Sequence, residues 1–295
     1  MKPADIARLV TLAAIWSLSF IFMRVVAPPL GPVWTAALRV LIGGAALVAW
    51  LALSGRDAGL REHWRAYLVI GVVNSALPFF LFAYAALTLP ASYMAILNAM
   101  VPLFAVILAA IWLNETLTFG RVLGIVAGIA GVALVTGAGA IDMHTKAWLA
   151  VGACLGATLC YAISAVGIKL RGGALSPYAI AAWSQVFAGL ALLPPAAIFP
   201  PAGPWTPTVV ACLLALALLC SAVAYLLYFR LLGDIGPTRT STVTFMLPAF
   251  GIVWGALLLD ETITLPMLAG AVLIVSGTAA VLRPVKAVQP AEAAR

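Results

Sequence analysis

Residues 114–118 read Asn-Glu-Thr-Leu-Thr, and residues 260–264 read Asp-Glu-Thr-Ile-Thr. Each of these short polar stretches follows a long apolar run and precedes a second apolar run that is rich in glycine. The two stretches begin 146 positions apart in a chain of 295 residues, so they stand at matching places in its two halves. The pattern predicts a fold built from two related halves.

The repeat extends over nearly the whole chain, at an offset of 145 near the start of each half and of 146 farther along. The matched pairs are Trp16 with Tyr161, Ser19 with Ser164, Arg24 with Lys169, Pro102 with Pro248, Gly124 with Gly270, and Gly131 with Gly277. We place the first half at residues 1–143 and the second half at residues 144–285. Residues 286–295 are expected to form a disordered cytoplasmic tail.

The composition excludes a soluble protein. Hydrophobic residues make up 65% of the chain and charged residues only 8%, whereas a soluble domain carries roughly 25% charged residues. The solvent that suits such a chain is lipid. The formal net charge of +7 does not indicate nucleic acid as a partner, because the basic residues are scattered singly rather than clustered on one segment.

The uncharged runs predict ten transmembrane helices, since a helix crosses the hydrocarbon in about 20 residues. Residues 66–114 and 172–229 are uncharged over 49 and 58 positions, which is enough for two spans each. Residues 1–55 hold two more, and Pro28, Pro29 and Pro32 are expected to stop one helix and start the next. Single spans are predicted at 122–141, 147–168, 240–259 and 262–282.

The basic residues predict the orientation, because cytoplasmic segments are enriched in Lys and Arg. With the N-terminus inside, thirteen of the sixteen lie on the cytoplasmic side, and the other three are Arg24, Arg39 and Lys146. This favours a bacterial inner-membrane protein with both termini in the cytoplasm. Because five spans is an odd number, the second half enters the membrane inverted. Inverted repeats are typical of transporters, since two such halves can open a central site alternately to each side.

Ten spans in two five-helix repeats, with Asn114-Glu115 and Asp260-Glu261 each preceding a glycine-rich last helix, resemble the drug/metabolite transporter superfamily and its EamA family. Within it, the chain is most similar to YddG-type exporters of aromatic amino acids. The resemblance implies an all-α membrane protein of the EamA fold. It also implies alternating access through a central cavity formed by the first, third, fourth, sixth, eighth and ninth spans.

Several kinds of chemistry have no residues to support them in this sequence. The four cysteines lie in apolar stretches without metal-ligand spacing, so we expect no metal and no cofactor. Paired acids, His clusters and nucleophile–base pairs are missing, which argues against an enzyme. No phosphate-binding loop and no Asp or Glu within a predicted span are found. These absences favour a facilitator, unless Glu115 or Glu261 couples transport to protons.

Candidate substrate-binding residues share helix faces. Ser75, Phe79 and Phe82 are spaced i, i+4, i+7, and the spacing recurs at 221, 225 and 228. We interpret the aromatic and weakly polar residues of these spans as a cavity wall suited to an apolar or aromatic side chain. The alternatives are helix packing, lipid contact and anchoring at the membrane interface. The candidates are Trp16, Ser19, Asn74, Ser75, Phe79, Phe82, Asn98, Tyr161, Ser164, Tyr225, Tyr228 and Thr244.

Arg39 is a further candidate, because its repeat position holds Ser184 and a residue required by the fold would recur. It is suited to bind a substrate carboxylate, and the alternative is that its head group reaches the lipid head groups. Pro102 and Pro248 lie inside spans, where a proline frees a backbone carbonyl. They predict either a substrate-binding bend or a simple kink, with Asn98 or Thr244 as the nearby partner.

The sequence therefore predicts an exporter of small metabolites, above all of amino acids with bulky or aromatic side chains. The alternatives are export of other small metabolites, efflux of lipophilic cations, and a membrane scaffold that transports nothing. Cations would call for an acidic residue within the spans, and a scaffold leaves the inverted repeat unexplained. The expected partners are a small-molecule substrate and the lipid bilayer. The spacing Gly124-x-x-x-Gly128 also suits helix association, but a monomer is expected.

Overall fold

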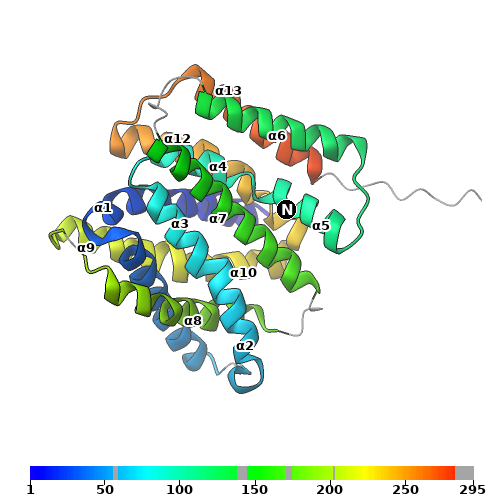
Figure 1. Ribbon diagram of the computed structural model, residues 1–295. Coiled ribbons are helices and arrows are strands. Elements are labelled where there is room, and N and C mark those ends of the chain that lie inside the picture. The colour runs from blue at the N-terminus through cyan, green and yellow to red at the C-terminus, as the bar shows by residue number, and fades with distance from the viewer. Residues whose placement is uncertain (56–58, 138–144, 171–174, 202, 283–295) are drawn as a thin grey trace, which may run out of the picture.

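A computed structural model describes residues 1–55, 59–137, 145–170, 175–201 and 203–282, and over these residues it is a bundle of helices without a strand (Figure 1). The helices are α1 (Pro3–Leu53), α2 (Leu60–Gly71), η1 (Val72–Ala76), α3 (Leu77–Ala85), α4 (Ala91–Asn98), α5 (Val101–Trp112), α6 (Phe119–Gly137), α7 (Thr145–Leu170), α8 (Pro177–Ile198), α9 (Pro207–Leu214), η2 (Ala215–Val223), α10 (Ala224–Ile235), α11 (Pro237–Thr240), α12 (Val243–Leu259) and α13 (Leu265–Val281). The predicted tail at 286–295 and the predicted boundary between residues 143 and 144 lie outside the described residues.

The protein is a multi-pass membrane protein. Within the described residues, seven helical stretches are long and apolar enough to cross a membrane, judged by length and composition. They are α1, α6, α7, α8 and the composite stretches Leu60–Ala85, Ala91–Trp112 and Pro207–Ile235. Two further apolar helices, α12 and α13, have 17 residues each. The count of ten crossings stays a prediction, which depends on how α1 is placed in the bilayer.

Helix α1 has 51 residues, more than twice the length of about 20 that one crossing needs. It bends at Gly31, where φ is 76° and ψ is 158°, a conformation that glycine adopts without steric cost. The expected change from one helix to the next at the three prolines is therefore a bend without a loop. The helix continues through Pro28 and Pro29 and resumes directly after Gly31. Pro32 can follow Gly31 directly, since the helical hydrogen bonds are already interrupted there.

Helices α6 and α13 lie side by side at one edge of the bundle (Figure 1). Glycine permits this contact: a Cβ on Gly124 would lie 2.6 Å from the Gly277 carbonyl oxygen, and one on Gly131 would lie 2.8 Å from the Gly270 oxygen. The two helices are antiparallel, because the residue number falls along one helix as it rises along the other. Gly124 thus contacts Gly277 rather than its repeat counterpart Gly270, and Gly131 contacts Gly270 rather than Gly277. This crossed pairing is expected for two inverted halves that face each other.

Gly128 packs against Leu103 of the same chain. Both glycines of the Gly124-x-x-x-Gly128 spacing are therefore used in packing inside the chain.

The fourth span is broken between Asn98, where α4 ends, and Val101, where α5 begins. Pro102 stands in the first turn of α5, where its missing N–H costs no hydrogen bond. The carbonyl of Ala99 in the break accepts a hydrogen bond of 2.9 Å from the Thr278 hydroxyl of α13. We expected a neighbouring Asn or Thr to fill this role, and the partner comes instead from the last helix of the other half.

Candidate functional site

A cavity of about 410 Å³ lies at the centre of the bundle. Its walls come from α1, η1, α3, the break between α4 and α5, α7, η2, α10 and α12. The predicted site residues that line it are Trp16, Ser19, Arg39, Asn74, Phe79, Phe82, Asn98, Pro102, Tyr161, Tyr225, Tyr228 and Thr244. The structure thus brings together residues that lie far apart in the sequence, from both halves of the chain.

Three predicted site residues are not among the residues that line the cavity. Ser75 is fully buried behind the wall, and Ser164 is 6% exposed on α7. Pro248 is buried inside α12, which continues through it as a helix. In this half the helix is interrupted earlier, at residues 241–242, so Pro248 is not at a break as Pro102 is.

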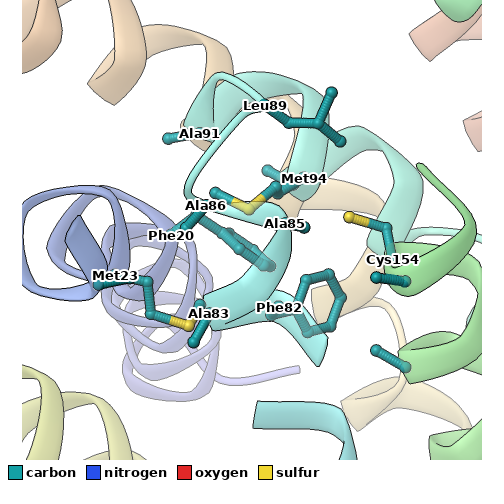
Figure 2. Packing of buried hydrophobic residues seen from close by; sticks show 14 of the residues in the cluster. Phe20, Met23, Phe82, Ala83, Ala85, Ala86, Leu89, Ala91, Met94 and Cys154 are labelled. Carbon is teal, nitrogen blue, oxygen red and sulfur yellow. The ribbon is translucent and has the colours of Figure 1, made fainter. Parts of the chain in front are cut away.

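Aromatic rings form much of the cavity wall. The ring centroids of Trp16 and Tyr228 are 5.4 Å apart, and those of Phe82 and Tyr161 are 6.3 Å apart in a stacked arrangement. Phe20 contacts Phe82 edge-on at 5.2 Å, and both rings lie in the packed region between α1 and α3 in Figure 2. These separations are typical of aromatic pairs in protein interiors.

Phe20 and Met23 line the cavity but were not among the predicted residues. They follow Trp16 by four and seven positions, so they lie on the same helix face. The spacing that led to Phe79 and Phe82 in the third span also identifies them. Figure 2 shows Met23 next to Ala83, where α1 and α3 meet.

Two π-helical turns occupy matching places in the two halves. η1 carries Asn74 and Ser75, and η2 carries Cys220 and Ser221 at the repeat positions. Asn74 and Cys220 line the cavity, and the Tyr225 side chain lies close to Asn74 and Ser75. π-Helical turns are rare and are often found at functional sites. Nothing in the spacing of apolar residues indicated them.

Arg39 is buried in the cavity wall, with 5% of its surface exposed. Its Nε donates a hydrogen bond of 3.0 Å to Ser221 Oγ, and its Cζ lies 3.6 Å above the centre of the Phe79 ring. The interpretation that its head group reaches the lipid head groups is wrong, because the bend of α1 turns this arm inward. Among the described residues, no Asp or Glu forms an ion pair with Arg39.

One end of the bundle is held together by Glu261, and we call it the Glu261 end. The carboxylate accepts hydrogen bonds from the backbone N–H groups of Ala91 (2.6 Å) and Ser92 (3.0 Å), and from Ser92 Oγ (2.6 Å). It therefore caps the first turn of α4, where a negative charge is favourable. Arg24 adds a second link, because its Nη1 donates to the Ala86 carbonyl at 2.6 Å.

The opposite end, which we call the Glu115 end, is arranged differently. Glu115 accepts a hydrogen bond of 2.9 Å from Lys169 Nζ and pairs with Arg121 at 3.4 Å. The Lys169 ammonium lowers the pKa of the Glu115 carboxyl, so the pair persists when the pH falls below the usual range for Glu. The cavity extends toward this end, since Leu282, just after α13, is among its lining residues.

A threonine caps the last helix of each half. Thr118 Oγ1 accepts a hydrogen bond from the Arg121 N–H, and Thr264 Oγ1 accepts one from the Met267 N–H. Each threonine oxygen accepts a hydrogen bond from a backbone N–H group that has no partner within its own helix, in the first turn of the last helix of its half.

The family model that matches this chain does so twice. It is described as the EamA-like transporter family and covers residues 6–137 and 148–283. The chain belongs to the EamA-like transporter family. The assignment places it among transporters rather than enzymes, and the two matches coincide with the repeat that the sequence shows.

The chain is also similar to known proteins over most of its length. The chain is 27% identical to the uncharacterised transporter YvbV of Bacillus subtilis (strain 168) over 83% of this chain and 80% of that protein. It is 24% identical to the uncharacterised transporter YoaV of the same organism over 91% and 93%. It is 25% identical to the protein PecM of Dickeya dadantii (strain 3937) over 89% and 86%. A solved crystal structure superposes with a TM-score of 0.69 at 18% identity over 95% and 96%, which shows the shared fold.

Proposed function

We propose that this EamA-like transporter exports amino acids with aromatic or bulky side chains by alternating access through its central cavity. The observation that carries the proposal is the set of seven aromatic side chains among the residues that line this cavity. Each ring pair formed with a substrate would contribute about 0.5–1.5 kcal/mol beyond the burial of its area. The volume of about 410 Å³ falls in the usual range for small-molecule sites.

The cavity wall disfavours lipophilic cations as substrates. Among the described residues that line it, none is Asp or Glu, and Arg39 is the one that is charged. A buried cation repels a second cation in a medium of low dielectric constant. Other small metabolites fit the cavity by size and remain the second candidate class.

The proposal includes a location and a mechanism. We place the protein in a bacterial inner membrane with both termini in the cytoplasm, where the Glu115 end faces inward. We propose a facilitator that moves substrate down its gradient, because no acidic group is among the described residues that line the cavity and a carboxylate relay would need one. The antiparallel contact of α6 with α13 supports two inverted halves that exchange conformations.

Substrate counterflow in proteoliposomes tests the proposal. Labelled phenylalanine outside liposomes loaded with unlabelled phenylalanine is expected to accumulate transiently, and aromatic and bulky amino acids are expected to compete. Collapse of the pH gradient should leave the uptake unchanged. Liposomes that contain heat-denatured protein are the control. No exchange of phenylalanine by folded protein would overturn the amino-acid assignment, and a loss of uptake without the pH gradient would overturn the facilitator mechanism.

A further inference from the structure

Arg39 is a fixed positive charge inside the cavity, and among the described residues no fixed negative charge lies opposite it. Its contacts are the Ser221 hydroxyl, the Phe79 ring and Met23 Sδ at 3.8 Å, all of them neutral. Removal of an arginine from water costs several kcal/mol unless an anion compensates for it. An anionic group on a substrate would provide this compensation.

The second charge of an amino acid has no matching partner. A carboxylate would pair with an ammonium group by charge, and among the described residues that line the cavity none is acidic. The polar lining groups near the rings are neutral, and they include Asn74, Asn98 and Thr244. The site can therefore hold a carboxylate by charge and a ring by stacking, whereas it holds an amine by neutral hydrogen bonds and ring faces, without an opposite charge.

We propose that the cavity selects aromatic monocarboxylates. The Arg39 guanidinium binds the carboxylate, and an α-amino group on the substrate is not required for binding. The proposal rests on the proposed function, since it assumes that this cavity holds the substrate. It deepens that function, because an aryl-substituted acid without an amine becomes a substrate class in its own right. Ser221 positions the guanidinium, and Phe79 supports it from one face.

Three phenyl compounds separate the charges. 3-Phenylpropionate carries the carboxylate alone, 2-phenylethylamine carries the amine alone, and phenylalanine carries both. Each is added to detergent-solubilised protein, and the shift of the melting temperature is measured as a readout of binding. The same compounds then compete in the counterflow assay. We expect 3-phenylpropionate to bind within about threefold of phenylalanine, and the amine to bind at least about tenfold more weakly.

Variants at position 39 locate the effect. Arg39→Gln is expected to abolish the preference for the acid over the amine, and Arg39→Lys to retain part of it, because lysine keeps the charge but not the planar fork. Arg61→Gln, at an exposed position, is the matched control and should retain the full preference. Equal binding of acid and amine to the unchanged protein, or a preference retained by Arg39→Gln, would overturn the proposal.

The two proposals can fail separately. Phenylalanine counterflow without a preference for the carboxylate would leave the export of amino acids standing and remove the role of Arg39. Stabilisation by 3-phenylpropionate without phenylalanine counterflow would support carboxylate selection and remove amino acids as the cargo.

The contacts at the two ends of the bundle carry a second, independent inference. Arg24 and Glu261 each reach across to another helix at the Glu261 end. Their repeat counterparts are Lys169 and Glu115, which bond to each other at the Glu115 end. Equivalent residues thus make different contacts in the two halves, and the cavity extends toward the end where these residues bond each other rather than the backbone of another helix.

We propose that these contacts exchange during transport. In the alternate conformation Glu115 and Lys169 close the Glu115 end, while Arg24 and Glu261 pair with each other. Lys169 would then bond the carbonyl of Leu232, the counterpart of Ala86, and Glu115 would reach the start of the ninth span. The Glu115–Lys169 pair is partly exposed and therefore weak, which lets it part at little cost.

Two substitutions with opposite expected effects test the exchange. Glu261→Gln removes the charged cap of α4 and should favour the alternate conformation, whereas Glu115→Gln should favour the conformation described here. The probe is Thr244→Cys in a chain whose four native cysteines are replaced by alanine. A membrane-impermeant maleimide is added from the Glu115 side in sealed vesicles, and the rate of labelling is measured.

Glu261→Gln is expected to slow the labelling at least about tenfold, because it weakens several charge-assisted hydrogen bonds. Glu115→Gln should leave the labelling from this side as fast or faster, and should slow labelling from the other side. Asp260→Asn is the control, since Asp260 is exposed and asparagine tolerates its φ of 52°. A shift in the same direction for both glutamate variants, or no shift in either, would overturn the exchange.

Discussion

The Phe79 ring lies directly beneath the Arg39 guanidinium, with 3.6 Å between Cζ and the ring centroid. Replacing it by leucine keeps an apolar side chain but removes the π-face, and a cation–π contact of this kind contributes about 1–2 kcal/mol when desolvated. We expect Phe79→Leu to raise the half-saturation concentration in counterflow by about five- to thirtyfold.

Phe80→Leu is the matched control for this prediction. Phe80 is partly buried against a neighbouring cluster and is not among the residues that line the cavity. Half-saturation should stay within about twofold of the unchanged protein in this variant. An equal increase for both variants would indicate a general loss of packing rather than the loss of a contact with Arg39.

At the scale of single residues, the sequence predicted much of the cavity wall. Helical spacing gave Phe79 and Phe82 correctly but also included Ser75, which lies behind the wall. The same spacing from Trp16 would have added Phe20 and Met23. The surroundings of Arg39 could not be predicted, because they depend on the bend at Gly31 and on η2, which carries Ser221. Neither the bend angle nor a π-helical turn produces a periodic pattern of apolar residues from which it could be predicted.

The contact between α6 and α13 depends on the absence of side chains where the two backbones meet. A Cβ on Gly277 would collide with the Gly124 carbonyl oxygen, and a backbone oxygen cannot rotate away as a side chain can. We expect Gly277→Ala to lower the free energy of unfolding by about 1–3 kcal/mol. Thermal unfolding in detergent would show this as a lower melting temperature.

Gly167→Ala is the control for the same substitution within a helix. Gly167 lies in α7, and a Cβ there would have no neighbour within 4 Å. Alanine should then be neutral or stabilise the protein by about 0.5–1 kcal/mol, because it restricts the unfolded chain. A loss of stability as large as that of Gly277→Ala would show that close approach is not the cause.

At the scale of helices, apolar runs and prolines indicated where spans lie better than where they break. The break in the fourth span lies next to Pro102, but the ninth span is interrupted before Val243, well away from Pro248. A proline permits an interruption without fixing its place, since neighbouring groups decide which carbonyl can be left free. Thr278 fills that role for Ala99 and lies 179 residues away in the sequence.

The number of membrane crossings is a property of the whole molecule, and it depends on whether α1 crosses the membrane once or twice. Two arms on either side of Gly31 give ten crossings and place both ends of α1 on one side of the membrane, whereas a single crossing would place them on opposite sides. We expect green fluorescent protein to fluoresce when it is fused at the N-terminus and also when it is fused after Ser54. This reporter becomes fluorescent in the bacterial cytoplasm but not after export through the general secretion pathway.

Alkaline phosphatase, which is active only outside the cytoplasm, provides the complementary measurement. It should be active after Gly203, between α8 and α9, and inactive after Thr116, between α5 and α6. Fluorescence at only one end of α1 would contradict the ten-span topology. It would also contradict the orientation that the distribution of Lys and Arg predicts.

The unpaired arginine also gives the transporter an electrical character. An empty cavity carries one positive charge, which a bound monocarboxylate cancels and a zwitterionic amino acid leaves in place. With a monocarboxylate as substrate, the membrane voltage therefore acts on the empty form and not on the loaded form, with up to about 2.3 kcal/mol per 100 mV for a charge that crosses the whole field. In a cell with a negative interior, the empty cavity is drawn to face the cytoplasm. The empty cavity of such a carrier is therefore mostly open to the cytoplasm, and the resting membrane voltage favours export of the substrate over import.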